Sequence, residues 1–192
     1  MKSTKKDGSQ AGSDDSCHPR GEQRMDFLIF SDSHGKIDRM QQALRRQPAP
    51  PLAVFHLGDG FRDTQYLELD GIPLYAVKGN CDLFYGSMTD ECPEEQITVI
   101  GNHRALLTHG ARYGVKSGLG GLISSAVRQR ADIVLYGHTH TPRLDTVPEG
   151  TELCGRILER PLYLFNPGSI AQGSFGTLTV QGDSVLFGHG TC

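Results

Sequence analysis

Side chains that can bind a metal ion recur in this 192-residue sequence directly after short apolar segments. Five such places contribute seven candidate ligands: Asp32, His34, Asp59, Asn80, His109, His138 and His140. Each motif alone has an ordinary explanation, because Asp, Asn and Gly are frequent in turns and a single histidine often packs in a core. The strongest single motif is Gly137-His138-Thr139-His140, since residues two apart in an extended chain point to the same side.

The types of ligand favour particular metals. Carboxylate, imidazole and amide groups without any thiolate suit divalent ions such as Mn, Fe or Zn. Seven ligands are more than one ion takes from a protein while it keeps positions open for water or substrate. We therefore expect two ions that share one carboxylate, because a shared anion screens the repulsion between ions about 3.5–4 Å apart.

Short apolar segments must bring these side chains together. Residues 25–30, 52–57 and 72–77 are rich in strand-forming residues. Apolar residues recur at helical spacing over residues 37–44, and Pro48 stops that segment. The resulting order of strand, helix, strand, helix, strand is typical of a parallel sheet with crossover helices. In such sheets the carboxyl ends of the strands meet at one crevice, which would collect the candidate ligands.

The second half of the chain is predicted to be mostly sheet. Segments 96–100 and 103–108 flank Gly101-Asn102 and are typical of a hairpin. A helix is expected in the second half of residues 114–130. Further strands are expected at residues 132–136, 143–147, 160–165, 177–180 and about 184–187. A chain that begins parallel and ends antiparallel fits an α/β fold with two packed sheets and helices outside.

The composition argues against several classes of protein. The sequence has no run of 18 uncharged apolar residues, so no membrane span is expected. Its formal net charge is −3 and it lacks long Lys/Arg runs, which argues against a general nucleic-acid coat. The 24 glycines predict many tight turns, and Gly58, Gly79, Gly110 and Gly137 each lie next to a candidate ligand.

Residues 1–24 differ from the rest of the chain. They contain no Val, Ile, Leu, Phe or Tyr, so they cannot bury enough apolar surface to offset the entropy of ordering. We predict a disordered N-terminal extension over residues 1–24, without a secretory signal, and one domain over residues 25–192. The five cysteines are odd in number and form no Cys-x-x-Cys pair, which favours reduced thiols and a cytoplasmic protein.

Four longer motifs carry a resemblance to a known family. They are Lys78-Gly79-Asn80-Cys81-Asp82, Leu107-Thr108-His109-Gly110, Tyr136-Gly137-His138-Thr139-His140-Thr141-Pro142 and Phe165-Asn166-Pro167-Gly168-Ser169. With Asp32-Ser33-His34 and Gly58-Asp59, they resemble the calcineurin-like metallophosphoesterases, and more narrowly the small bacterial and archaeal phosphodiesterases of that superfamily. The resemblance spans about residues 25–187. It implies a four-layer αββα sandwich with two mixed sheets and a di-metal site at the strand ends.

The resemblance also implies how the ligands divide between two divalent metal ions. One ion would be held by Asp32, His34, Asp59 and His140. The other would be held by Asp59, Asn80, His109 and His138, so that Asp59 bridges the two ions. Manganese is the metal expected, with Fe, Zn, Ni or Mg as alternatives. A hydroxide that bridges the ions would attack a small phosphodiester in line.

One position departs from the superfamily pattern. The superfamily commonly has histidine after Gly-Asn, where this sequence has Cys81 followed by Asp82. Cysteine stabilises charge on a departing oxygen less well than histidine, so a poor leaving group should react slowly. Within the resemblance, Gly-Asn-Cys-Asp accompanies a preference for phosphodiesters, and the predicted catalytic residues are Asp59, Asn80, Cys81 and Asp82. Alternatively, Cys81 is a small thiol packed beside the site.

Two other functions stay open at this point. A phosphomonoesterase, including a protein phosphatase, could use the same site, although Cys81 argues against it. A non-catalytic scaffold of the same fold, as in the retromer coat, has a degenerate metal site, whereas all seven ligands are present here. Loops 83–95 and 112–121 are the candidates for substrate contact, and self-association into a homo-oligomer is left open.

Overall fold

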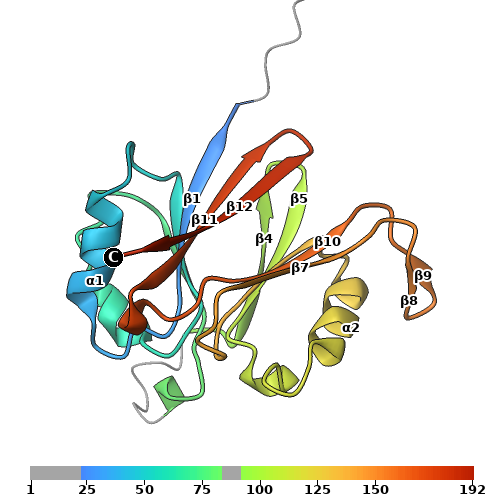
Figure 1. Ribbon diagram of the computed structural model, residues 1–192, viewed down its shortest axis with the longest axis horizontal. Coiled ribbons are helices and arrows are strands. Elements are labelled where there is room, and N and C mark those ends of the chain that lie inside the picture. Colours follow the sequence, from blue (N-terminus) through green and yellow to red (C-terminus); the bar gives the residue numbers. More distant parts are fainter. Residues whose placement is uncertain (1–22, 84–91) are drawn as a thin grey trace, which may run out of the picture.

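Two five-stranded sheets lie face to face in the computed structural model, which describes residues 23–83 and 92–192 (Figure 1). The first sheet has the order β12 (Ser184–Thr191), β11 (Ser174–Gln181), β1 (Met25–Phe30), β2 (Ala53–His56) and β3 (Leu74–Ala76). The second has the order β4 (Glu95–Ile100), β5 (His103–Thr108), β6 (Ile133–Tyr136), β10 (Leu162–Asn166) and β7 (Arg143–Val147). A separate hairpin joins β8 (Glu152–Leu153) and β9 (Arg156–Ile157).

Parallel strands form the centre of each sheet. In the first sheet β1, β2 and β3 pair in parallel, and β11 adds antiparallel to β1. In the second sheet β5, β6 and β10 pair in parallel, with β4 and β7 antiparallel at the two edges. Both sheets are therefore mixed, and the carboxyl ends of the parallel strands in each sheet share one edge.

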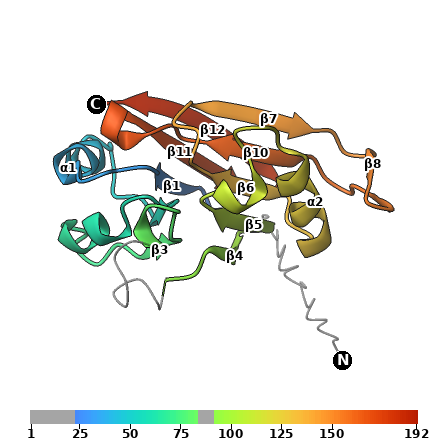
Figure 2. The same cartoon turned by 90° about the horizontal axis from the view of Figure 1, so that it is seen from below.

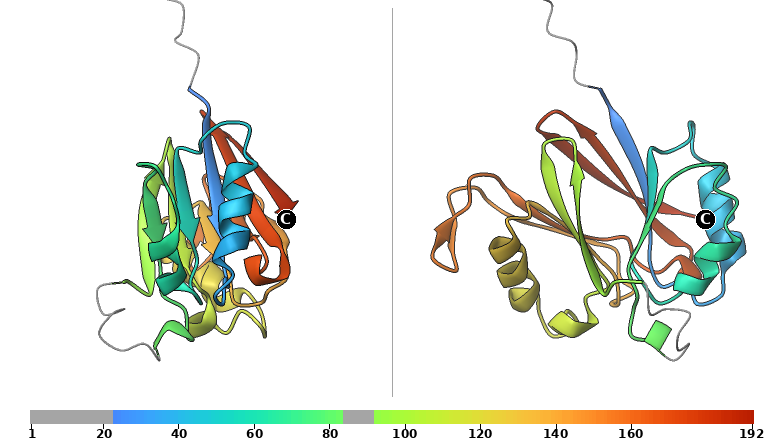
Figure 3. Two further views of the ribbon diagram at one scale, coloured as in Figure 1. Left: turned by 90° about the vertical axis from the view of Figure 1, so that its left-hand side faces the viewer. Right: turned by 180° about the vertical axis from the view of Figure 1, so that it is seen from behind.

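Helices cover the outer faces of the two sheets. Helix α1 (Ile37–Arg45) buries Met40 and Ala43 against the outer face of the first sheet. Helix α2 (Gly120–Gln129) buries Leu122 and Ala126 against the outer face of the second. Figures 2 and 3 show the two helices on opposite sides, with the sheets between them. The four-layer αββα sandwich with two mixed sheets is confirmed.

The apolar runs of the sequence are explained by burial on both faces of each sheet. In β1, Phe27 and Ile29 pack in the core between the sheets, whereas Leu28 and Phe30 pack under α1. Strand β6 behaves in the same way, because its alternate residues contribute to the central core and to the core under α2. Strands buried on both faces read as continuous apolar runs rather than as alternating ones.

Some elements differ from the sequence-based expectation. The link between β2 and β3 contains only a short 3₁₀ helix, Phe61–Tyr66, where a crossover helix was predicted. Gly71, with φ 87° in the left-handed region, and Pro73 lie between this 3₁₀ helix and β3. Neither residue is favoured inside an α-helix. The β8–β9 hairpin was not predicted, because its turn is Cys154-Gly155 rather than a common Asn-Gly pair.

Two predictions concern residues outside the described part of the chain. Residues 1–22 of the predicted N-terminal extension lie outside the described residues, as do residues 84–91 of the first predicted substrate loop. Among the helices of residues 23–83 and 92–192, none has both the length and the apolar character needed to cross a membrane.

Candidate active site

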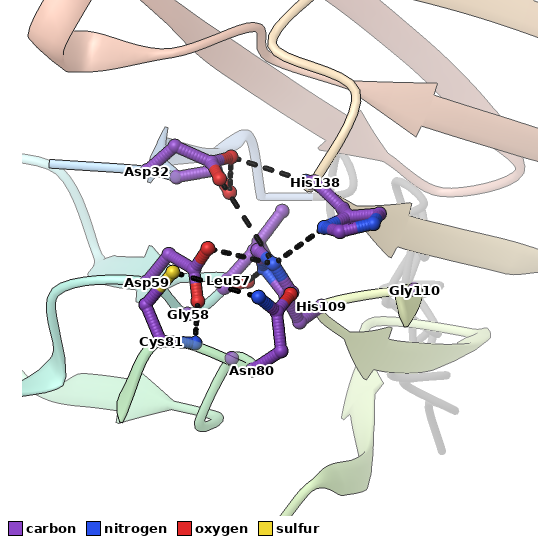
Figure 4. Close-up of polar contacts among 12 residues, drawn as sticks. Asp32, Leu57, Gly58, Asp59, Asn80, Cys81, His109, Gly110 and His138 are labelled. Carbon is purple, nitrogen blue, oxygen red and sulfur yellow. Dashed lines mark hydrogen bonds and ion pairs between the residues drawn. The ribbon is translucent and has the colours of Figure 1, made fainter. Parts of the chain in front are cut away.

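The loops that follow four central strands meet at one edge of the sandwich. Asp32 comes two residues after β1 and Asp59 three residues after β2, while His109 directly follows β5 and His138 comes two residues after β6. Figure 4 shows these four side chains converging from opposite sheets, with Asn80 beside them. The fold thus gathers side chains that are more than a hundred residues apart in the sequence.

Six of the seven predicted ligands form two compact groups. One group is Asp32, His34 and His140, the other is Asp59, His109 and His138, and the ligand atoms within each group lie within 4.8 Å of one another. These are the two sets implied by the family resemblance, apart from Asn80 and the shared use of Asp59. Asn80 is exposed on the loop after β3, and its amide lies next to Asp59 and His109 in Figure 4.

Short distances connect the members of each group. His140 Nε2 lies 3.1 Å from Asp32 Oδ1, and His109 Nε2 lies 3.3 Å from Asp59 Oδ2. The two groups also adjoin, because His109 Nε2 is 3.2 Å from His138 Nδ1 and 3.9 Å from Asp32 Oδ1. The site is therefore one continuous cluster with room for two separate centres of ligation.

The buried carboxylates make this cluster suitable for cations. Asp32 is fully buried, and its Oδ1 has no hydrogen-bond partner among the described residues. His140 Nε2 lies near this oxygen, but a buried carboxylate oxygen without a hydrogen bond is costly unless a cation compensates its charge, so Asp32 fits a metal ligand. Two carboxylates, four imidazoles and one amide are a donor set for Mn, Fe or Zn. The residues present fit the ions that the sequence predicted.

The pKa values of Asp59 and His109 are both shifted by the charges around them. Burial alone would raise the pKa of Asp59, but the hydrogen bond and charge of His109 and the Cys81 N–H outweigh it, so this pKa lies well below its ordinary value. Burial alone would lower the pKa of His109, but Asp59 and Asp32 raise it above its ordinary value. The pair therefore favours positive charge beside the carboxylates.

The backbone is strained at most of the candidate ligands. Five of them have φ between +42° and +69°, in the left-handed region that residues other than glycine rarely adopt: Asp32, His34, Asp59, His138 and His140. Such conformations persist only where surrounding contacts fix them, and they concentrate at functional sites. The sharp turn directly after each strand is what aims these side chains at one another.

Two glycines allow the loops to approach closely. A Cβ on Gly79 would lie 2.1 Å from Asp59 Oδ1, and a Cβ on Gly137 would lie 1.9 Å from Ser31 Oγ. Any larger residue at either position would displace a candidate ligand or its hydrogen-bond donor, since Ser31 Oγ donates to Asp32 Oδ2 over 2.6 Å. These two glycines are required by the site rather than by the turn alone.

Asp82 supports the site from behind. It is buried, and its carboxylate accepts backbone hydrogen bonds from Asp59, Gly60, Phe61 and Gly79 at 2.8–3.0 Å. The loop after β2 is thereby tied to the loop after β3. Asp82 was predicted as a catalytic residue, but its geometry is that of a positioning residue that acts through Asp59.

Cys81 contributes to the site mainly through its backbone. Its N–H donates to Asp59 Oδ1 over 2.7 Å, a bond that any residue except proline would make. Burial raises the pKa of the Cys81 thiol to about 11, and nearby Asp59 contributes to this shift. In the metal-free protein the group is therefore a neutral thiol near pH 7, and it cannot carry positive charge as a histidine can.

A buried relay behind Asp32 and Asp59 was not predicted. His56 Nδ1 accepts from the Gly58 N–H (3.3 Å), so its Nε2–H donates to Ser33 Oγ (3.2 Å), which donates to Asp63 Oδ2 (2.6 Å). Burial lowers the pKa of His56 to about 4, which keeps the ring neutral. The relay joins the loops that carry Asp32 and Asp59. Only its position two residues before Gly58-Asp59 marks it in the sequence.

The Asn-Pro-Gly-Ser turn also supports two ligand loops. Asn166 Nδ2 donates to the carbonyl of Gly137 over 2.8 Å, and Ser169 Oγ donates to the carbonyl of Asp32 over 2.9 Å. Gly168 has φ 79° and its N–H donates to Asn166 Oδ1. This motif thus has a structural task next to the site, on the loops that bear Asp32 and His138.

Two open clefts flank the cluster. The first, the Tyr66 cleft, has a volume of about 320 Å³ and is lined by His34, Arg62 and Tyr66 among others. The second, the Arg112 cleft, has a volume of about 230 Å³ and includes Asn80 and Arg112 in its lining. The Tyr66 cleft includes the candidate ligands His34 and Asp59, and the Arg112 cleft includes Asn80 and His109.

Comparison with known proteins places the chain in a family. The model of the calcineurin-like phosphoesterase superfamily domain matches residues 25–190. The chain belongs to this superfamily. It is 31% identical over 166 residues to the probable metallophosphoesterase YsnB of Bacillus subtilis (strain 168), and the match covers 83% of this chain and 87% of that protein. Membership in this superfamily supports metal binding and hydrolysis of phosphate esters.

Solved structures give the same answer for the fold. A conserved protein of Streptococcus pneumoniae TIGR4, described as a predicted phosphoesterase, is 26% identical with a TM-score of 0.64, covering 88% of this chain and 90% of that one. Vacuolar Protein Sorting 29 from Cryptosporidium parvum is 18% identical with a TM-score of 0.61, covering 88% and 99%. At that identity the second likeness shows the fold alone.

Proposed function

We propose that the protein is a di-metal phosphodiesterase that acts on a small phosphodiester. The observation that carries this proposal is the pair of adjoining ligand groups around Asp32, whose buried Oδ1 accepts no hydrogen bond from the described residues. The ions would be held by the seven residues predicted from the sequence: Asp32, His34, Asp59, Asn80, His109, His138 and His140. When bound, divalent ions neutralise phosphoryl oxygens and make a water molecule more acidic.

The protein's own residues would fix the geometry of the reaction. The strained turns hold Asp32 and Asp59 without further rearrangement, and the Cys81 N–H fixes one oxygen of Asp59, leaving Oδ2 toward His109. We assign Asp59 as the shared ligand, as the family resemblance implies, and its Oδ2 faces His109, whose Nε2 also lies 3.9 Å from Asp32 Oδ1 of the other group (Figure 4). Preorganised ligands of this kind reduce the reorganisation needed during reaction.

Two features favour diesters over monoesters. The neutral Cys81 thiol provides no positive charge for a poor leaving group, so a substrate with a better leaving group is preferred. A diester has two ester groups, and the Tyr66 and Arg112 clefts on the two sides of the cluster offer a place for each. A monoester would use only one of these clefts.

The test compares two aryl phosphates on one preparation. The protein is stripped with chelator, Mn²⁺ is restored, and hydrolysis of bis(p-nitrophenyl) phosphate is measured against that of p-nitrophenyl phosphate. We expect metal-dependent hydrolysis with the diester preferred. Asp59→Asn should lower kcat/KM roughly 1000-fold, which is about 4 kcal/mol, while Asp145→Asn on exposed β7 leaves it unchanged. Equal or greater activity on the monoester would refute the substrate class, and no metal-dependent hydrolysis of either would refute the enzyme.

A further inference from the structure

A large cleft lies away from the candidate active site. It has a volume of about 930 Å³ and is lined by the start of β5 and β6, the end of α2 and the β8–β9 hairpin with the segment that leads to β10. Figure 1 shows this hairpin projecting beyond α2. Asp132 and Gly137 stand at opposite ends of β6, so roughly 17 Å of strand separates this cleft from the metal-ligand cluster.

Four arginines line this cleft, which we call the arginine cleft: Arg104, Arg130, Arg156 and Arg160. Two acidic residues, Asp132 and Glu159, accompany them, so the lining is positive in a chain whose net charge is −3. The Asp132 carboxylate is already engaged, because His103 Nδ1 and the Arg104 N–H each lie 2.7 Å from one of its oxygens. The positive charge is therefore only partly compensated within the protein.

The arginines fall into an anchored pair and a free pair. Arg104 Nε donates to the carbonyl of Gln129 over 2.9 Å, and Arg160 Nη2 lies 3.1 Å from Asp183 Oδ1. Arg130 and Arg156, in contrast, have no side-chain hydrogen bond or ion pair with any residue of 23–83 or 92–192. Two fixed guanidinium groups beside two free ones can bind an anion with several acceptor oxygens, because each guanidinium presents paired donors to phosphate.

The rest of the lining is apolar. Val127, Leu158 and Leu162 contribute to the wall, and Ile157 on β9 is 66% exposed beside them. An apolar wall next to arginines suits a ligand that combines phosphate groups with a flat or apolar body, since guanidinium groups also stack on aromatic rings. The volume lies at the upper end of the range of small-molecule pockets, which run to about 1,000 Å³.

We propose that the arginine cleft is a binding site for a nucleotide-sized phosphate ester, separate from the metal-ligand cluster. Arg130 and Arg156 would bind the phosphate groups, and the apolar wall would contact the base. This site does not depend on the proposed phosphodiesterase activity. Strands β5 and β6 run from this cleft to His109 and His138, so an occupant would touch the same two strands that position those ligands.

The test is calorimetric titration of the full chain with ATP in the presence of EDTA, so that no metal ion can recruit phosphate to the other site. Arg130→Ala with Arg156→Ala should weaken binding about tenfold or more. The matched control removes the same charge elsewhere, with Arg46→Ala directly after α1 and Arg128→Ala on α2, both exposed, and should leave the Kd unchanged. Thermal unfolding verifies that both double variants fold.

Two further outcomes decide the proposal. Inorganic triphosphate should bind more weakly than ATP, because it cannot use the apolar wall, and equal affinity would overturn the assignment of a nucleotide-sized ligand. The absence of ATP binding to the wild-type chain, or an equal loss of affinity in both double variants, would overturn the site itself. Binding should also weaken with added salt, as charge recognition requires.

Discussion

At the carboxyl ends of β5 and β6, His109 and His138 lie among buried carboxylates and strained turns, whereas at the amino ends of the same strands Arg104 and Arg130 lie exposed. The loops of both sheets that meet at the first end are held by a dense set of buried hydrogen bonds through Asp82, Asn166 and Ser169. At the second end the Asp132 carboxylate is bonded to His103 Nδ1 and to the Arg104 N–H, while the arginine side chains themselves are exposed. Strands β5 and β6 thus contribute to a rigid, negative site that both sheets build at one edge, and to an adaptable, positive cleft at the other.

Of the substitutions considered for the two edges, Asp82→Ala should lower the free energy of unfolding most. Asp82→Ala leaves four buried or half-buried backbone N–H groups without their carboxylate, so we expect the free energy of unfolding to fall by about 3 kcal/mol. Urea denaturation of the metal-free protein measures this change. Asp145→Ala, which breaks the exposed Asp145–Arg143 pair, is the control and should change stability by less than about 1 kcal/mol. Similar losses in both variants would remove the contrast between rigid and adaptable edges.

His56 predicts a pH dependence that belongs to the rigid edge alone. Because burial lowers its pKa in the folded state to about 4, the unfolded chain binds a proton between about pH 6.5 and pH 4 that the folded chain does not. The contribution of the neutral His56 ring to the free energy of unfolding is thus complete above pH 6.5 and is lost as the pH falls. We expect the wild type to lose roughly 2 kcal/mol from this source between pH 7 and pH 5.

The measurement is the difference between wild type and His56→Gln in urea denaturation at both pH values. The variant should lack the extra loss at pH 5, whatever its stability at pH 7. The NMR titration of the His56 ring provides a second readout and should show no protonation above about pH 5. A ring that titrates near pH 6.5, or identical pH dependence in both proteins, would contradict the buried relay.

The smallest change in the free energy of unfolding is expected for a substitution at the arginine cleft. Arg160→Ala removes an exposed ion pair with Asp183, whose side chain is 76% exposed, so stability should change by about 0.5 kcal/mol or less. The same urea experiment measures it, with Asp183→Ala as the partner variant. A loss of 2 kcal/mol or more would show that this edge is as tightly built as the other.

The positions of the candidate ligands could be predicted because they follow from simple rules. Strands such as those at residues 25–30 and 132–136 could be predicted from their continuous apolar character. The polar residues that follow parallel strands meet at one edge of the sheet. The family motifs added the division into two groups. The metal, the substrate, the cytoplasmic location and any homo-oligomer stay predictions.

The rest could not be predicted because it depends on tertiary contacts. Asp82 follows Asn80 and Cys81 in a motif associated with catalysis, and only the fold shows that its carboxylate turns back to the Asp59 loop. His56 reads as an ordinary core histidine until Ser33 and Asp63 are placed beside it. The four arginines of the cleft share no spacing, since the end of α2 and the unpredicted hairpin bring them together.

The central claim is that the two ligand groups together hold two divalent ions. Its most direct test is the metal content of the purified full chain after Mn²⁺ loading and removal of excess metal, measured by mass spectrometry of the element. We expect two ions per chain in the wild type, with fewer retained in Asp59→Asn because we propose that this carboxylate is shared. One ion or none per wild-type chain, or two ions retained equally by Asp59→Asn, would contradict it.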